Sequence, residues 1–300
     1  MYKQTFSPTL SPLSQGAGAR WSNALKTAAL LAAMTALTLA VGQLIGGARG
    51  LLWAGALVTL MNLGSFWFSD RLALMMNRAR PLAPSELPWL EQLTAQLAQR
   101  GGLPMPKLYV IDTPTPNAFA TGRSPAKAAV AVTTGLLQLM DRRELAGVLA
   151  HELSHVKNRD TLTMTVAGTL AGVISHVSQM VFWFGGSFLR NADDDEGTNP
   201  LVALGLLVVA PLTATLIQLA ISRAREFDAD AAAAQLTGDP EGLASALSRL
   251  ERGNQALPLD HSPATAHMFI VNPLSSSGVM RLFATHPPID ARVRRLLAMR

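Results

Sequence analysis

Two histidines and a glutamate lie close together in this chain, in a pattern that could hold a metal ion and activate water. His151, Glu152 and His155 form an HExxH motif. On a helix, residues four apart lie on one face, so both imidazoles could bind one zinc ion at about 2.0–2.1 Å. Glu152 lies about 100° around the helix from His151, where it could take a proton from a zinc-bound water that attacks a peptide carbonyl. The motif indicates zinc-assisted hydrolysis.

A chance match is the alternative to a zinc site. The chain contains six histidines, and a chance HExxH motif is expected in about one per cent of such sequences or fewer. Asp141 and Glu144 have the spacing of a capping box, which predicts a helix start just before the motif. Apolar residues then follow at helical spacing as far as Val156. This helical setting favours zinc binding over coincidence.

A catalytic zinc site also needs a third protein ligand and an open position. The chain has no cysteine, so histidine or a carboxylate must supply that ligand. Glu226 and Asp230 are four residues apart and lie on one face of a predicted helix. We assign Glu226 as the third ligand of a single zinc ion, and Asp230 as a carboxylate that supports a ligating histidine. The alternative is that both carboxylates lie on a solvated helical face.

Four apolar stretches flank these residues and are long enough to cross a bilayer, which needs about 20 residues. Charged residues make up 15% of the 300-residue chain, against about 25% in a typical soluble domain. The first two stretches, residues 27–48 and 51–69, are separated by Arg49 and Gly50 and predict a tight hairpin. The others lie within residues 161–189 and 197–222. The alternative for these last two is buried helices of a soluble core.

Lysine and arginine are concentrated on one side of the predicted spans. Under the positive-inside rule, both termini and the segments that carry the zinc motif should face the cytoplasm. This distribution explains the net charge of +5 better than nucleic-acid binding does. The zinc helix should run directly into the third span, and the fourth span should return Glu226 to the two histidines. Charged residues beside the motif place the metal outside the hydrocarbon and argue against an intramembrane protease.

These observations predict an α+β, mainly α-helical fold, with four transmembrane helices and a cytoplasmic zincin-like metalloprotease domain. The expected divisions are an N-terminal tail (1–25), a transmembrane hairpin (26–70), a first protease part with the zinc helix (71–160), a second transmembrane hairpin (161–222) and a second protease part (223–300).

The first protease part combines helix and strand signals. A helix is predicted from Ser85 through Leu97 and closed by glycines, followed by a strand over Lys107–Ile111. Extended segments over Asn117–Thr121 and Ala128–Thr134 predict a hairpin. In the second part, the segment from Gly253 to Ala284 lacks periodicity and predicts a loop over the active-site cleft.

The chain resembles the HtpX-type membrane zinc metallopeptidases, which are relatives of the CAAX prenyl endopeptidase. The motif HELSHxxNRD covers His151–Asp160, and SRxREFxAD covers Ser222–Asp230. The resemblance extends over most of the chain from the first span onward. It implies a bacterial inner-membrane endopeptidase of the stress response that cleaves misfolded or damaged membrane proteins. It also implies His151, His155 and Glu226 as zinc ligands and Glu152 as general base.

A further resemblance concerns residues 116–122, which are similar to the family's substrate-binding edge strand. It implies that Asn117, Ala118 and Phe119 bind an extended peptide through backbone hydrogen bonds. The alternative is an ordinary buried strand.

Near the C-terminus, Thr285–Pro288 together with Arg292 resembles the family's last motif. It implies that His286 and Arg292 help to stabilise the oxyanion, because a donor there would act where charge develops. The alternative is a structural helix start.

Two other functions remain as alternatives to an endopeptidase. One is a membrane scaffold that binds zinc without catalysis, against which the intact Glu152 argues. The other is an intramembrane protease or a transporter, against which the charges beside His151 argue. The partners expected are the lipid bilayer and unfolded membrane proteins, with no nucleic acid.

Overall fold

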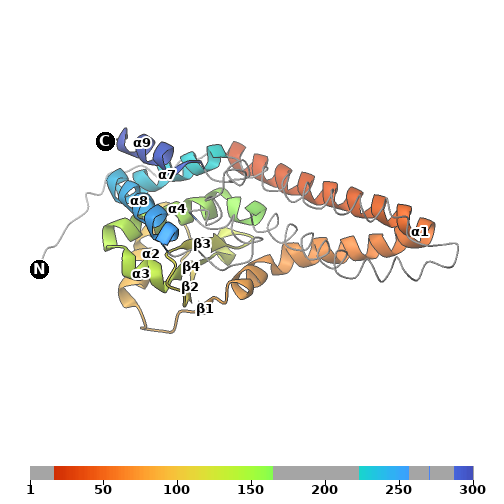
Figure 1. The fold of residues 1–300 in the computed structure, drawn as a ribbon, viewed down its shortest axis with the longest axis horizontal. Coiled ribbons are helices and arrows are strands. Elements are labelled where there is room, and N and C mark those ends of the chain that lie inside the picture. Colours follow the sequence, from red (N-terminus) through yellow and green to blue (C-terminus); the bar gives the residue numbers. More distant parts are fainter. Residues whose placement is uncertain (1–16, 165–222, 257–269, 271–286, 300) are drawn as a thin grey trace, which may run out of the picture.

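The computed structural model of this chain describes residues 17–164, 223–256, 270 and 287–299. Figure 1 shows two long helical arms that extend side by side from a part containing a small sheet and several shorter helices. This arrangement confirms the mainly helical α+β class.

The two arms belong to a single element, α1 (Ala17–Met76), which reverses direction at two glycines. Gly47 has φ 54° and ψ −137°, a conformation that essentially only glycine adopts. Farther along, a Cβ on Gly50 would collide with the carbonyl oxygen of Gly42, so the arms touch through their backbones there. The predicted hairpin is therefore present, but its turn lies at Gly46 and Gly47. The expected position at Arg49 and Gly50 was wrong, because Gly50 is needed for close packing.

Among the described residues, no helix combines the length and the apolar character needed to cross a membrane. The third and fourth predicted spans lie within residues 161–189 and 197–222, and apart from residues 161–164 these fall outside the described part of the chain. The prediction of four transmembrane helices is therefore not confirmed, and the five chain divisions remain predictions.

Four short strands form one sheet in the order β1-β2-β4-β3. They are β1 (Arg80–Pro81), β2 (Lys107–Ile111), β3 (Ala118–Thr121) and β4 (Ala129–Thr133). Strands β2 and β4 are parallel, whereas β1 and β3 each pair antiparallel with their neighbour. The predicted strand and hairpin are confirmed, with a short 3₁₀ turn, η1 (Pro125–Lys127), inside the hairpin connection. Strand β3 lies at one edge of the sheet.

The two faces of the sheet pack against different helices. Side chains such as Leu108, Val110 and Val132 join the main core with the shorter helices. Ile111, Phe119, Ala129 and Ala131 instead contact the end of α1. Alanine is a poor strand former, but small side chains suit β4 because α1 packs closely over that face.

Three α-helices lie within residues 77–158, and the last of them contains the HExxH motif. Helix α2 (Pro88–Gly101) ends at Gly102 in the left-handed conformation, as its glycines predicted. Helix α3 (Thr134–Leu139) follows β4. Helix α4 (Arg142–Asn158) begins at the predicted capping box. There the Asp141 carboxylate accepts from the Glu144 amide at 2.8 Å, and the Glu144 carboxylate accepts from the Asp141 amide at 3.1 Å.

The C-terminal helices pack around α4. They are α7 (Arg223–Thr237), α8 (Pro240–Ala256) and α9 (Ile289–Leu297). Helices α7 and α8 contact α4, and α9 contacts α7 and α8. Helix α8 continues through Ala256, so the predicted loop does not begin at Gly253. The reason is that the buried face of Leu243, Leu247 and Leu250 extends to Asn254. Apart from Ile270, the remainder of that loop lies outside the described residues.

The chain turns sharply where α4 ends. Arg159 has φ 59°, in the left-handed region that residues with a side chain seldom adopt. Its amide closes the helix through the carbonyl groups of His155 and Val156, and residues 160–164 are helical again. The prediction that the zinc helix runs uninterrupted into the third span was therefore wrong.

Candidate active site

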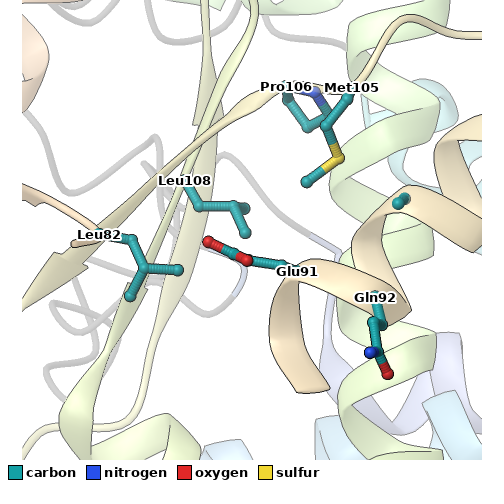
Figure 2. A pocket seen from close by; sticks show the side chains of 7 residues that line it. Leu82, Glu91, Gln92, Met105, Pro106 and Leu108 are labelled. Carbon is teal, nitrogen blue, oxygen red and sulfur yellow. The ribbon is translucent and has the colours of Figure 1, made fainter. Parts of the chain in front are cut away.

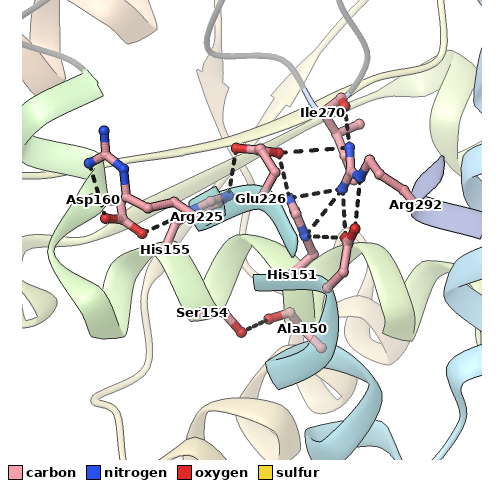
Figure 3. Close-up of polar contacts among 10 residues, drawn as sticks. Ala150, His151, Ser154, His155, Asp160, Arg225, Glu226, Ile270 and Arg292 are labelled. Atoms are coloured by element: carbon pink, nitrogen blue, oxygen red, sulfur yellow. Dashed lines mark hydrogen bonds and ion pairs between the residues drawn. The ribbon is translucent and has the colours of Figure 1, made fainter. Parts of the chain in front are cut away.

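Three side chains from two helices converge in the region drawn in Figure 3. Helix α4 contributes His151 and His155, and α7 contributes Glu226. The Nε2 atoms of the two histidines are 3.2 Å apart. The Glu226 carboxylate oxygens lie 3.7 Å from His151 Nε2 and 3.6 Å from His155 Nε2. All three side chains are buried.

These separations fit one tetrahedral metal ion. Ligand atoms bound to zinc at about 2.0–2.1 Å are about 3.3 Å from one another in a tetrahedron. The three observed separations span 3.2 to 3.7 Å. Two nitrogens and a carboxylate oxygen are also donors that zinc accepts. The residues present therefore fit a zinc ion with three protein ligands.

A carboxylate lies at the second ring nitrogen of each histidine. Asp230 Oδ1 is 3.0 Å from His151 Nδ1, which is the contact that its predicted supporting role requires. Asp160 Oδ2 is 3.1 Å from His155 Nδ1. An ionised carboxylate can only accept, so each Nδ1 carries a hydrogen and each Nε2 is the ring nitrogen left to bind a metal. The sequence predicts Asp160 only as a flanking charge. No spacing signals its contact with His155, because in a continuous helix residue 160 would point about 140° away from that ring.

Arg292 of α9 is fully buried behind His151. Its Nε and Nη2 donate to the two oxygens of Asp230 at 2.8 and 2.7 Å, and its Nη1 donates to the Ile270 carbonyl at 3.1 Å. The structure therefore brings Arg292 to the site, with its guanidinium bound to Asp230. His286, its predicted companion, lies outside the described residues.

The pKa values of the two buried histidines are shifted in opposite directions. Burial lowers the pKa of His151 to about 4; Asp230 opposes this, but the nearby charge of Arg292 adds to it. Burial also acts to lower the pKa of His155, yet the hydrogen bond to Asp160 and the charge of Glu226 outweigh it and raise the pKa to about 9. In the metal-free centre, a proton at neutral pH therefore sits on His155, while His151 is neutral.

Glu152, the predicted general base, is buried beside the two histidines. Burial raises its pKa to about 7; the charge of Glu226 acts the same way, and a hydrogen bond from the Ala120 amide opposes it. A carboxylate with a pKa near the working pH is suited to accept a proton and return it.

Strand β3 packs against α4 at the edge of the sheet. The Asn117 carbonyl accepts from the Thr133 amide at 3.0 Å, so Asn117 bonds to β4. The antiparallel register makes Phe119 and Thr121 bond to β4 as well. The backbone groups of Ala118 and Ala120 consequently point away from β4. Of the three residues predicted to bind substrate, Ala118 alone directs its backbone away from β4, and its amide already donates to Asn117 Oδ1 at 3.0 Å.

A surface pocket of about 400 Å³ lies apart from this centre, beside α2 and β2 (Figure 2). It is lined by Leu82, Glu91, Gln92, Ala95, Met105, Pro106 and Leu108. None of these residues belongs to the histidine cluster, so the pocket is separate from the metal centre.

Comparison with known proteins gives a consistent result. Residues 84–300 match peptidase family M48. The chain is 48% identical over 277 residues to a protease HtpX homolog of Desulforapulum autotrophicum, covering 91% of this chain and 89% of that protein. It is also 48% identical over 280 residues to protease HtpX of Legionella pneumophila (strain Lens), covering 92% and 99%. The crystal structure of S. mikatae Ste24p has a similar fold, with a TM-score of 0.50 at 20% identity, over 94% of this chain and 66% of that one.

Proposed function

The chain belongs to peptidase family M48 as an HtpX-type zinc metalloprotease, and on this premise we propose that it hydrolyses misfolded or damaged membrane proteins at the membrane surface. The observation that carries the proposal is the buried convergence of His151, His155 and Glu226, with ligand atoms 3.2–3.7 Å apart. These three side chains would hold one zinc ion per chain. When bound, zinc supplies Lewis-acid chemistry that makes water nucleophilic near neutral pH.

Glu152 acts as general base and then as general acid. Its carboxylate takes the proton from the attacking water and returns it to the leaving amine of the cleaved peptide. Asp230 keeps the lone pair of His151 on Nε2, and Arg292 holds Asp230 in place. The guanidinium of Arg292 is engaged with this carboxylate, so we assign it to orientation of Asp230 and not to direct contact with substrate.

The outer edge of β3 supports a way to bind unfolded polypeptide. An extended peptide would donate to the backbone carbonyls of Ala118 and Ala120, whose amides already donate to Asn117 Oδ1 and to the Glu152 carboxylate. Asn117 and Phe119 keep the strand attached to β4. Recognition through backbone hydrogen bonds makes few demands on substrate side chains, which suits the cleavage of many different unfolded proteins.

Exposed apolar side chains on the second arm of α1 support a membrane location. Leu52, Trp53, Leu57, Leu60 and Leu63 are all exposed, and an apolar surface of this kind is typical of contact with lipid or a partner. Trp67 and Phe68 follow at the end of this arm, beneath the guanidinium groups of Arg123 and Arg71. Aromatic and basic residues gather in this way at membrane–water interfaces. We place this end, the protease part and both termini on the cytoplasmic side of a bacterial inner membrane.

The variant Glu152→Gln tests the assignment. The purified full-length protein in detergent should keep zinc near one ion per chain, because Glu152 is not a ligand. Its cleavage of a denatured membrane protein should fall by about 10²–10⁴-fold, the usual contribution of a general base. Glu91→Gln, in the pocket beside α2, is the matched control and should cleave normally. Full cleavage by Glu152→Gln would overturn the proposal.

A further inference from the structure

Asp160 makes the same kind of contact with His155 as Asp230 makes with His151. Its Oδ2 is 3.1 Å from His155 Nδ1, and Asp230 Oδ1 is 3.0 Å from His151 Nδ1. Both carboxylates are buried, with 1% and 3% of their surface exposed. They come from different elements, because Asp230 lies within α7 and Asp160 follows the turn after α4.

The local backbone explains how a residue so close to His155 reaches its ring. Within a continuous helix, residue 160 would point about 140° away from His155. The left-handed conformation of Arg159, with φ 59°, breaks the helix and redirects the chain at this point. The next residue secures the new direction, because the Thr161 hydroxyl donates to the Gly122 carbonyl at 2.9 Å.

An arginine also contacts this second carboxylate. Arg225 Nη1 lies 3.3 Å from Asp160 Oδ1, and Arg225 precedes the ligand Glu226 in α7. The ion pair therefore joins the turn after α4 to the helix that delivers the third ligand. Figure 3 shows Arg225 and Asp160 on one side of the ligand cluster and Arg292 on the other. Each histidine thus has a carboxylate at Nδ1, and each carboxylate has an arginine.

We propose that Asp160 is a positioning residue for the zinc ligand His155, and that Arg225 orients Asp160. By accepting from Nδ1–H, Asp160 leaves Nε2, which lies 3.2 Å from His151 Nε2, as the ring nitrogen that can bind the metal. It also resists rotation of the ring, which would carry Nε2 out of the cluster. This inference rests on the proposed zinc site and adds a residue that sequence reasoning had not assigned.

A purely structural role is the competing explanation. Asp160 is the first residue of the helical stretch 160–164, and aspartate commonly caps such a start. A capping role would lower stability when Asp160 is replaced, but it would leave the intrinsic affinity of the folded protein for metal unchanged. Metal affinity and metal coordination therefore distinguish the two explanations.

The test compares Asp160→Ala and Asp160→Leu with the full-length wild type in detergent. Zinc dissociation constants are measured by competition with a chelator, and the visible absorption of the cobalt-substituted protein reports the ligand geometry. We expect zinc affinity to fall about 10–100-fold in Asp160→Ala, the usual effect of losing such a support, together with a changed cobalt spectrum. Asp228→Asn replaces an exposed carboxylate of the same helix as Glu226 and should change neither readout.

Arg225→Gln is the second variant in the test. It should weaken zinc binding less than Asp160→Ala does, and it should add nothing in the double variant, because Arg225 acts through Asp160. If Asp160→Ala fails to fold, Asp160→Leu decides, since it has a similar branched shape but cannot accept a hydrogen bond. Unchanged zinc affinity and an unchanged cobalt spectrum in the folded variant would overturn the inference. Failure of the proposed function would appear separately, as normal cleavage by Glu152→Gln.

Discussion

Asp230 and Arg292, 62 residues apart in the chain, form a buried two-point ion pair with N–O distances of 2.8 and 2.7 Å. The same carboxylate contacts His151. The last helix of the protein is therefore linked to the metal site through one acidic side chain. Because both partners are buried, the pair connects stability to metal binding.

Arg292→Met should lower the free energy of unfolding by about 3–5 kcal/mol, because it leaves the Asp230 charge buried without its partner. Chemical denaturation of the detergent-purified protein measures this. Arg143→Ala, which removes an exposed ion pair with Asp239, is the control and should change stability by less than about 1 kcal/mol. A loss of similar size in the two variants would contradict the interpretation of a buried pair.

Zinc binding to the metal-free protein should release at least one proton per ion at pH 7. His155 has a pKa raised to about 9, so it is protonated at pH 7 and the metal must displace that proton. His151, with a pKa lowered to about 4, has none to lose. Zinc affinity should consequently fall as the pH falls from 9 toward 5. Calorimetry in buffers of different ionisation enthalpy counts the protons, and proton-independent binding would contradict the assignment.

Ala120→Pro should reduce kcat/KM about tenfold while zinc content stays unchanged. The Ala120 amide points away from β4 and donates to the Glu152 carboxylate, so proline removes a hydrogen bond that holds the general base without breaking the sheet. One backbone hydrogen bond contributes about 1–1.5 kcal/mol, which corresponds to roughly tenfold in rate. Steady-state kinetics on an unstructured peptide check this. Normal kinetics would argue that the Ala120 amide does not orient Glu152.

Gly147→Ala should destabilise the protein by about 1–3 kcal/mol, although alanine favours helices. The added Cβ would lie 2.9–3.0 Å from the backbone of Leu243, where α4 crosses α8. Gly64→Ala is the matched control, because a Cβ there meets nothing within 4 Å. Thermal unfolding of both variants measures the difference. Equal stability would mean that the two helices separate without penalty.

The natural absence of cysteine makes labelling of single-cysteine variants direct. Ala126→Cys, exposed on η1, should react with a membrane-impermeant maleimide in inside-out vesicles and not in right-side-out ones. Leu60→Cys, on the exposed apolar face of α1, should react in neither until detergent is added. Reaction of Leu60→Cys in sealed vesicles would refute the membrane placement of this arm.

The sequence predicts the features that depend on residues close together along the chain. The spacing of His151 and His155 places both on one helical face, and the Asp141 capping box starts that helix as predicted. The spacing of Glu226 and Asp230 likewise puts them on one face of α7. Backbone hydrogen bonds between residues a few positions apart determine these relations, so the chain itself contains the information.

Tertiary packing alone decided the relations between distant segments. The register of α7 on α4 selects Glu226 to meet both Nε2 atoms, and α9 brings Arg292 to Asp230. The left-handed turn at Arg159, which no periodic pattern signals, delivers Asp160 to His155. Such contacts depend on how whole faces of side chains fit together. The amino-acid sequence by itself therefore determined which chemistry was available, and the fold decided which residues support each ligand.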